Sequence, residues 1–377
     1  MRLQPIVTAC VLAGITLLLY AFHLDAAPLT PEEAAFNTHG QSIRAGWTPV
    51  YFRVRDDQWL QPAAVYANAL AQRAGGGEAS GRFASAVLGS LNVALVFLIA
   101  HLITGRWWIA SIGAILLMLT PAHWSFAQLG TDAIFPAPLI LWWLWHLLRF
   151  FRGDSLQSMS AAAAFLGLSI YSHPAAPLTA AFLWLLTLVA ARRRNLQRLA
   201  VATLVFGAAW LPAAFWFYRH PDTYADTFGR WVIFAAHIRS PLDLLTAFFN
   251  PTTLGNRLSM YWGFWNPSWL FFGSAAPLLL AAAPLIAAGV YRCVRHVQRE
   301  LPALVLGGAL IVPLAGASFG VPRYLAAAAA VLPLLALLCA IGVEQLVAVV
   351  VRPAPLQDDE GAMSTESWNA DDIAPRA

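Results

Sequence analysis

The sequence contains no lysine and few charges of either sign. The 23 cationic Lys or Arg positions are all arginine, and charged residues make up 11% of the chain, whereas an ordinary soluble domain carries about 25%. This scarcity excludes an ordinary soluble domain. Apolar residues make up 59% of the 377 residues, with a mean hydropathy of +0.62, and they are gathered in long blocks. The composition therefore predicts an all-α polytopic membrane protein.

Cysteine is also scarce, and metal-binding and nucleic-acid motifs are missing. Cys10, Cys293 and Cys339 lie in or at the end of apolar blocks and have no metal-ligand spacing. They are interpreted as small buried residues. The net charge of +4 fits basic loops beside a membrane better than a nucleic-acid surface. Membrane lipids are therefore expected partners, and nucleic acid is not.

The apolar blocks predict ten membrane spans, separated by short turns and two long loops. The first block could be a signal peptide, but it is about long enough to cross a bilayer, so it is interpreted as an uncleaved first helix. The predicted spans lie at 6–23, 84–104, 108–124, 134–150, 160–173, 175–191, 198–218, 270–291, 302–318 and 324–346.

Arginine near the span ends predicts the orientation of the chain. The side predicted to be cytoplasmic, with both termini, holds Arg2, Arg106, Arg149, Arg152, Arg192, Arg198, Arg292, Arg295 and Arg299. The opposite loops, which include 24–83 and 219–269, hold most of the polar residues. They are predicted to face the periplasm or the cell exterior.

The domain organisation follows from these spans. Residues 1–352 are predicted to form one transmembrane domain. Loop 24–83 contains two polar segments with helical periodicity, which suit helices lying on the membrane surface. Loop 219–269 is rich in aromatic residues, as is typical of a membrane interface. Residues 353–377 are acidic and contain proline, so a disordered cytoplasmic tail is predicted.

Two adjacent carboxylates, Glu32 and Glu33, follow the first span. Thr30 can cap a helix there with Pro31 as its first residue, and carboxylates in a first helical turn are stabilised by the helix dipole. Alternatively, one of the two is a general base at the membrane surface. The pair alone does not separate capping from catalysis.

The order of short motifs along the chain narrows this choice. The acid pair in "PEEA" is followed by "RAGWTP", "QPA", "GRFASAVLGSL", "TPAHWSFAQLGTDA" and, before the last span, "VPRY". Over about residues 1–346 this order resembles the bacterial family 39 glycosyltransferases of the GT-C class, which include protein O-mannosyltransferases and the lipid A aminoarabinose transferase. The resemblance implies a GT-C-like fold. It also implies transfer of a sugar from a polyprenyl phosphate to an acceptor at the outer face of the membrane.

The resemblance implies roles for particular residues as well. The family's Asp-Glu pair falls on Glu32 and Glu33, so a longer glutamate replaces the catalytic aspartate, and misplacement by about 1 Å can cost on the order of 100-fold in rate. Gln61 stands where the lipid A branch has a lysine that contacts the carrier phosphate. Arg53 or Arg55 could substitute for that missing cation.

Five further residues are candidates for the site. Arg82 matches an arginine that recurs before the second span, and Arg323 matches one thought to face the carrier phosphate. Each could instead be an interfacial anchor. Asp132 is interpreted either as a further acid of the site or as the N-cap of the fourth span. His39 and His173 could line the site, and neither has metal-ligand spacing.

Together these expectations describe an inverting transferase. Glu32 deprotonates an acceptor hydroxyl, Glu33 and Asp132 orient the acceptor or assist, and the carrier phosphate leaves near Arg323. No nucleotide cofactor is expected, and a divalent metal, which some distant relatives use, stays an open alternative. Two other functions also stay open: a catalytically degenerate membrane scaffold of the same fold, and a lipid or sugar transporter. The acceptor is a lipid, a glycan or a protein.

Overall fold

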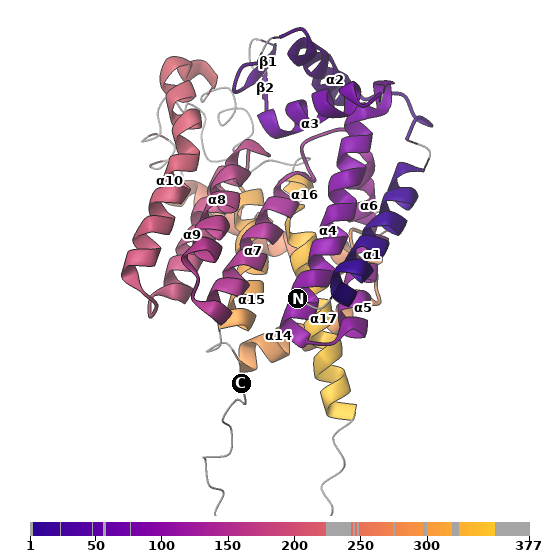
Figure 1. Ribbon diagram of the computed structural model, residues 1–377, viewed down its shortest axis with the longest axis vertical. Coiled ribbons are helices and arrows are strands. Elements are labelled where there is room, and N and C mark those ends of the chain that lie inside the picture. Colours follow the sequence, from indigo (N-terminus) through magenta and orange to yellow (C-terminus); the bar gives the residue numbers. More distant parts are fainter. Residues whose placement is uncertain are drawn as a thin grey trace, which may run out of the picture.

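The computed structural model shows a bundle of helices with a small cap at one end (Figure 1). The described residues are 3–22, 24–46, 48–55, 58–75, 77–223, 243, 246, 249–273, 276–296, 300–318 and 324–350. The tail predicted to be disordered, 353–377, lies outside them, as does much of the loop 219–269.

The segment between the first two long helices of the bundle forms the cap. Helices α2 (Pro31–Arg44) and α3 (Pro62–Arg73) pack against each other, and the strands β1 (Phe52–Arg55) and β2 (Gln58–Leu60) form an antiparallel hairpin between them in sequence. A short helical turn, η1 (Gly77–Ala79), leads back into the bundle. The two predicted helices of this segment are confirmed, and their place on the membrane surface stays a prediction. The hairpin was not predicted, because strands this short carry little periodicity.

The remaining described helices form the bundle, and every predicted span overlaps at least one of them, whereas the helix Pro251–Phe264 lies in the predicted loop 219–269. They are α1 (Leu3–Ala21), α4 (Ser80–Thr104), α5 (Trp107–Leu119), α6 (Pro121–Gln128), α7 (Pro136–Gly153), α8 (Leu156–Leu168), η2 (Ser169–Tyr171), α9 (Ala176–Ala191), α10 (Leu196–Arg219), α13 (Pro251–Phe264), η3 (Ser268–Phe272), α14 (Ala282–Arg295), α15 (Glu300–Gly316), α16 (Tyr324–Ala327) and α17 (Val331–Val350).

Three predicted spans are less regular than expected. Segment 108–124 is two helices, α5 and α6, which meet at an angle of 61° where Pro121 follows Thr120. A proline disfavours helical backbone in the residue before it, and Thr120 is extended. In segment 270–291, the regular α-helix begins only at Ala282, the first residue of α14. Segment 324–346 is divided between the two helices α16 and α17.

Several bundle helices have membrane-spanning character. Within the described part of the chain, 4 helices are long and apolar enough to cross a bilayer, or up to 5 if the bent α5–α6 pair is one span. The α8–η2 segment, α9 and α15 are shorter apolar helices. The chain is therefore a multi-pass membrane protein, and the total of about ten spans stays a prediction.

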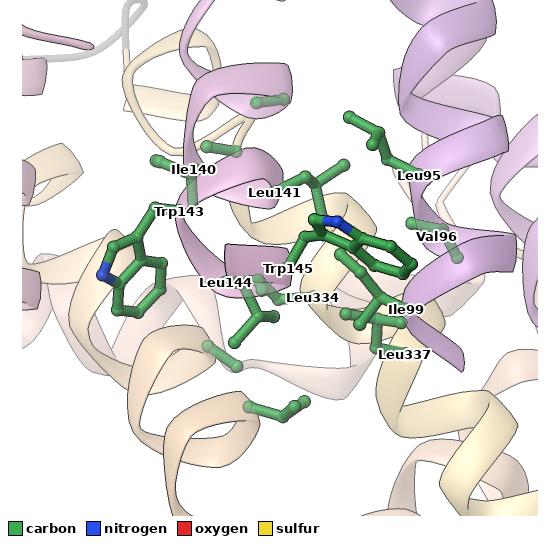
Figure 2. Close-up of a cluster of buried hydrophobic side chains, with 14 of the residues drawn as sticks. Leu95, Val96, Ile99, Ile140, Leu141, Trp143, Leu144, Trp145, Leu334 and Leu337 are labelled. Atoms are coloured by element: carbon green, nitrogen blue, oxygen red, sulfur yellow. The ribbon is translucent and has the colours of Figure 1, made fainter. Parts of the chain in front are cut away.

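The core of the bundle lies where α4, α7 and α17 meet. Figure 2 shows the ring of Trp145, on α7, pointing toward Val96 and Ile99 of α4, with Leu337 of α17 beside them. On another side of α7, the buried Trp143 donates a hydrogen bond from Nε1 to the hydroxyl of Thr187 at 3.1 Å. Close packing of this kind, together with hydrogen bonds between helices, stabilises helix bundles inside a bilayer.

Two glycines bring α14 and α17 into close contact. A Cβ added at Gly342 would collide with the carbonyl oxygen of Leu285, and one at Gly289 would collide with that of Leu338. Any side chain at either position would push the two backbones apart. Small residues with this effect are typical of helix interfaces in membranes.

Candidate active site

Helix α2 begins with a complete cap. The hydroxyl of Thr30 accepts a hydrogen bond from the N–H of Glu33, the Glu33 carboxylate accepts one from the N–H of Thr30, and Pro31 opens the helix. This reciprocal pairing satisfies two N–H groups that would otherwise lack partners at the helix start. The predicted cap at Thr30 is confirmed, with Glu33 at the position that completes it.

The carboxylate of Glu33 also has partners from two other segments. Arg82, in the first turn of α4, donates from Nε to Oε1 at 2.7 Å and from Nη2 to Oε2 at 2.9 Å. The N–H of Gly130, in the turn after α6, donates to Oε1 at 2.9 Å. Glu33 is 2% exposed. The result is a buried, bidentate ion pair that joins the cap to two parts of the bundle.

Arg82 uses its remaining donors on backbone carbonyl groups. Nη1 donates to the carbonyl oxygens of Leu24 and Ala27, each at 2.7 Å, and Nη2 donates to that of Pro28 at 3.0 Å. A guanidinium group has five N–H donors, and with the two oxygens of Glu33 each donor has an acceptor. A phosphate could bind Arg82 only by displacing these partners. The geometry therefore favours a role in holding the segment between α1 and α2.

Two glycines allow these segments to approach each other. A Cβ added at Gly130 would lie 3.1 Å from the backbone nitrogen of Arg82, and one at Gly81 would lie 3.3 Å from the Cα of Gly130. Both distances are tighter than ordinary van der Waals contact. The absence of side chains at both positions lets the turn after α6 come close enough for its N–H to reach Glu33.

The surroundings of Glu33 determine its charge. Burial alone would raise the pKa of this carboxyl, but the hydrogen bonds from Arg82, Gly130 and Thr30 outweigh burial and lower the pKa from 4.5 to about 2. Glu33 is therefore ionised at neutral pH. A general base works best with a pKa near the working pH, so Glu33 is a poor proton acceptor.

The other two predicted acids have different surroundings. Glu32, in the first turn of α2, is partly exposed, whereas Glu33 is buried. Asp132 is buried and lies in the same turn as Gly130, so this acid belongs to the segment that binds Glu33. Phe135 is the N-cap of α7, and its N–H donates to the carbonyl oxygen of Asp132 at 3.2 Å, so Asp132 opens the turn that leads into this helix.

Three candidates lie in the hairpin and at the start of α3. Gln61 is buried at the N-cap of α3, and Pro62 follows as the first helical residue. The guanidinium of Arg53 is 5.7 Å from the centre of the Trp59 ring, which it faces across the hairpin as a cation–π pair. Arg55 ends β1, and its side chain lies outside the described part of the structure.

The two candidate histidines lie in different parts of the fold. The ring of His39, on α2, lies 5.6 Å from that of Phe52 in β1, and burial lowers its pKa, so it is neutral at pH 7. His173 is buried in the turn before α9, where its Nδ1 accepts a hydrogen bond from the N–H of Ala175 at 3.0 Å. Its ring proton is therefore on Nε2.

Arg323 and the two residues before it lie outside the described residues. The described chain resumes at Tyr324, whose ring lies 5.4 Å from that of Phe264 in α13. The predicted contact of Arg323 with a carrier phosphate stays a prediction.

Cysteine and metal chemistry can be assessed over the described residues. Within them, no group of three or more His, Cys, Asp or Glu side chains is placed to hold a metal ion. Cys293 and Cys339 are buried, as predicted, but Cys10 is exposed. The difference arises because α1 packs on the bundle with one side only and leaves apolar residues such as Val7 and Val11 exposed.

Residues 62–216 match the family described as dolichyl-phosphate-mannose-protein mannosyltransferase. The structure also resembles that of ArnT from Cupriavidus metallidurans bound to undecaprenyl phosphate, with a TM-score of 0.61 and 16% identity over 93% of this chain and 64% of that chain. The chain has the GT-C fold. The resemblance predicted from the ordered motifs is confirmed.

Two further solved structures share the GT-C fold with this chain. The apo state of the same ArnT gives a TM-score of 0.60 and 17% identity, over 89% of this chain and 59% of that chain. The oligosaccharyltransferase of Archaeoglobus fulgidus, in complex with Zn and sulfate, gives a TM-score of 0.54 and 17% identity, over 92% of this chain and 51% of that chain. The chain thus spans between about half and two thirds of the length of these structures. No curated protein matches it in sequence.

Sequence analysis missed a polar cluster that joins the cap of this GT-C chain to its bundle. Gln72, on α3, donates from Nε2 to the carbonyl oxygen of Asn37, on α2, at 3.0 Å. The hydroxyl of Ser80, at the start of α4, lies 3.2 Å from Oδ1 of Asn37 and 2.6 Å from Oδ1 of Asn68. All four residues are buried. The sequence signal for this cluster was available: Asn37, Asn68 and Gln72 lie on the apolar sides of the two predicted surface helices.

Proposed function

We propose that this protein is a membrane glycosyltransferase that moves a sugar from a polyprenyl phosphate to an acceptor hydroxyl at the cap-bearing end. The GT-C fold and the family match over residues 62–216 support a transferase. The undecaprenyl phosphate bound to the similar ArnT structure supports a lipid-linked donor. The sugar can be a hexose or a pentose, and the acceptor a lipid, a glycan or a protein.

The observation that carries the mechanism is the unequal environment of the two adjacent acids. Glu33 is buried and ionised, and its carboxylate accepts hydrogen bonds from Arg82, Gly130 and Thr30. Glu32 is partly exposed on the same helical turn. The ion pair of Glu33 holds the start of α2 in place, and Glu32 is therefore presented from a rigid support. Rigid support of a reacting group is what precise catalysis requires.

The proposed reaction is a single displacement at the anomeric carbon. Glu32 accepts the proton of the acceptor hydroxyl, and the hydroxyl oxygen forms the new bond to the anomeric carbon. The bond from that carbon to the phosphate oxygen breaks, and its electron pair leaves with the polyprenyl phosphate. Attack opposite the leaving group inverts the configuration. Asp132 follows Gly130 in the turn beside Glu33, and its proposed role is to orient the acceptor.

Cations must neutralise the leaving phosphate. With the donors of Arg82 occupied, the proposal assigns this role to Arg323 and to the hairpin arginines Arg53 and Arg55. Gln61 cannot supply charge, and its burial at the N-cap of α3 leaves it a hydrogen-bonding role. Arg323→Ala should therefore weaken use of the lipid donor, and Arg323→Lys should restore it only in part, because the planar fork is lost.

The proposed orientation places the cap in the periplasm and both termini in the cytoplasm of a bacterial inner membrane. The described arginines at the ends of α7 and α14 lie at the end of the bundle away from the cap (Figure 1). Clusters of arginine in short loops mark the cytoplasmic side. An impermeant thiol reagent should label a cysteine at Gly77 in cells with a permeabilised outer membrane, and should not label one at Asn195. The reverse pattern would place the site in the cytoplasm.

The activity test uses purified protein in vesicles that contain a lipid-linked sugar. Glu32→Gln should abolish transfer while expression and donor binding stay near normal, because the amide keeps the shape but accepts no proton. Glu78→Gln is the matched control, since Glu78 is exposed in the same loop. It should keep full activity. Glu32→Asp restores the residue usual in the resembling family, and its activity reports whether the pocket still fits the shorter acid.

The same vesicles separate the two other functions. Movement of the lipid-linked sugar across the bilayer without transfer, equal in wild type and Glu32→Gln, would identify a transporter. Neither transfer nor movement in wild type and all variants would identify a scaffold. Most described ionisable residues lie at the ends of the bundle rather than within spans, which argues against a transport pathway.

A further inference from the structure

A cavity of about 680 Å³ lies at the end of the bundle away from the cap. Its walls come from the first turns of α1, the last turns of α4, the start of α5 and the end of α7. Figure 1 shows these helix ends opposite α2 and α3, so the cavity is separate from the proposed active site. Its volume is within the range of about 300–1,000 Å³ that is typical of small-molecule sites.

The lining of this cavity is amphipathic. Leu98, Leu102 and Ile103 form an apolar wall, and Gln4 and Arg152 supply polar groups at the helix ends. Trp107 also lines the cavity and is 58% exposed, as is typical of a tryptophan at a membrane interface. The arrangement suits a molecule with an apolar part and a polar head.

A second pocket, of about 400 Å³, adjoins the first and adds another cation. The two pockets share Leu102 and Arg152, and the second is also lined by Arg149 and Ser158. Both arginine side chains are exposed. Arg152 donates to the carbonyl oxygen of Leu102, and no ion pair of Arg149 occurs among the described residues.

The nearby acid does not neutralise these two cations. Asp154, which follows the end of α7, is paired with Arg198 from α10. The mouth shared by the two pockets is therefore positively charged. His101 also lines the first cavity, and its Nδ1 is buried and has no hydrogen-bond partner within the described structure.

We propose that this pair of joined pockets is a binding site for an anionic phospholipid. The phosphate group lies between Arg149 and Arg152, the hydroxyl groups of the head reach toward His101, and the acyl chains follow the wall formed by Leu98 and Ile103. A free phosphate ion would use the two arginines but not the apolar wall. The apolar wall and the interfacial tryptophan therefore favour a lipid as the source of the phosphate.

The test measures lipid binding by the purified full-length protein in neutral detergent. Phosphatidylglycerol, phosphatidylcholine and inorganic phosphate are titrated separately, with the thermal unfolding midpoint and native mass spectrometry as readouts. Arg149→Gln/Arg152→Gln is the site variant. Arg193→Gln/Arg295→Gln is the control, because it removes the same charge from exposed positions at the same end of the bundle. Unfolding midpoints without lipid confirm that the variants are folded.

Wild type and control should bind phosphatidylglycerol alike, and the affinity of the site variant should fall about tenfold or more, because two charge-assisted contacts are lost. Phosphatidylcholine should bind more weakly than phosphatidylglycerol to wild type. If the double variant does not fold, Arg149→Gln alone should still lower the affinity. Equal affinity in site variant and control would overturn the proposal. Inorganic phosphate that protects wild type as well as the lipid does would show a free-anion site instead.

Discussion

Arginine side chains at the two ends of the bundle have opposite environments. At the cap, Arg82 is buried and each of its donors has an acceptor in the protein, including both oxygens of Glu33. At the other end, Arg149 and Arg152 are exposed beside two joined pockets. One arrangement is complete without a ligand, and the other leaves charge available to one.

This difference separates structural charge from binding charge. A buried ion pair costs desolvation energy, and it persists only where every donor and acceptor is satisfied. Arg82 meets that condition, so replacing it should damage the fold. An exposed cation without an ion pair contributes little to stability, so replacing Arg149 should damage binding alone.

The largest effect is expected for Arg82→Ala. The change leaves the carboxylate of Glu33 buried without its cation and frees the carbonyl groups of Leu24, Ala27 and Pro28. Breaking one partner out of a buried pair costs about 3–5 kcal/mol. The free energy of unfolding in mixed micelles should fall by that amount, and proteases should cleave the cap faster.

Arg53→Ala is the control for this prediction. Arg53 is exposed on the hairpin, where a cation–π contact at the surface contributes about 0.5–1 kcal/mol. Its loss should therefore leave the cap protected from proteases. An Arg82→Ala variant as stable as Arg53→Ala would show that the buried pair holds nothing in place.

The second prediction concerns acid. The pKa of Glu33 is about 2 in the folded chain, whereas the ordinary value for a glutamate is 4.5. A group with a lowered folded pKa stabilises the fold above its unfolded pKa, and this stability is lost as the pH falls through the folded pKa. Stability should therefore decline between about pH 4.5 and pH 2 by about 3 kcal/mol, because each tenfold change in proton affinity corresponds to about 1.4 kcal/mol.

Acid titration of two variants checks the assignment to Glu33. Glu33→Gln should flatten the decline over this range, because the titrating group is gone, while its stability at pH 7 is lower. Glu78→Gln, at an exposed position of the same loop, should keep the wild-type curve. A curve of unchanged slope in Glu33→Gln would assign the acid sensitivity to other carboxyls.

The third prediction concerns the glycine that lets the turn after α6 reach the ion pair. A Cβ at Gly130 would lie 3.1 Å from the backbone nitrogen of Arg82. Gly130→Ala should therefore destabilise the protein by about 1–3 kcal/mol, the usual cost of overpacking. Gly207, inside α10, has no atom within 4 Å of an added Cβ. Gly207→Ala should be neutral or stabilise by about 0.5–1 kcal/mol. Equal effects would show that the turn has space to move.

Much of the fold could be predicted because span signals are local. Apolar blocks of spanning length predicted the positions of the bundle helices other than α13, which lies in the predicted loop 219–269. Thr30 followed by Pro31 predicted the start of α2. The bend of 61° at Pro121 depends on a local signal that was available but was treated as part of one span. The hairpin gave no such signal, because its strands, Phe52–Arg55 and Gln58–Leu60, are 4 and 3 residues long.

The site was harder to predict because its contacts are distant in sequence. Glu33 and Arg82 are 49 residues apart, and Glu33 and Gly130 are 97 apart. The sequence predicted all three on the outer side of the membrane. It could not show that Glu33, the second acid of the pair, is buried. Nor could it show that every donor of Arg82, a candidate site residue, already has an acceptor in the protein. An isolated arginine at the start of a span, facing an acid pair, was the available signal.

The smallest effect on stability is expected for Arg149→Ala at the opposite end. Arg149 is exposed, and no ion pair of it occurs in the described part of the chain, so its removal leaves no buried partner uncompensated. Surface substitutions of this kind change the free energy of unfolding by less than about 0.5 kcal/mol. In lipid-free detergent the variant should therefore unfold like wild type. With phosphatidylglycerol added, wild type should gain more stability than the variant, since a ligand that binds only the folded state stabilises it. A large loss without lipid would mean that Arg149, like Arg82, is part of the fold, and the contrast between the two ends would not hold.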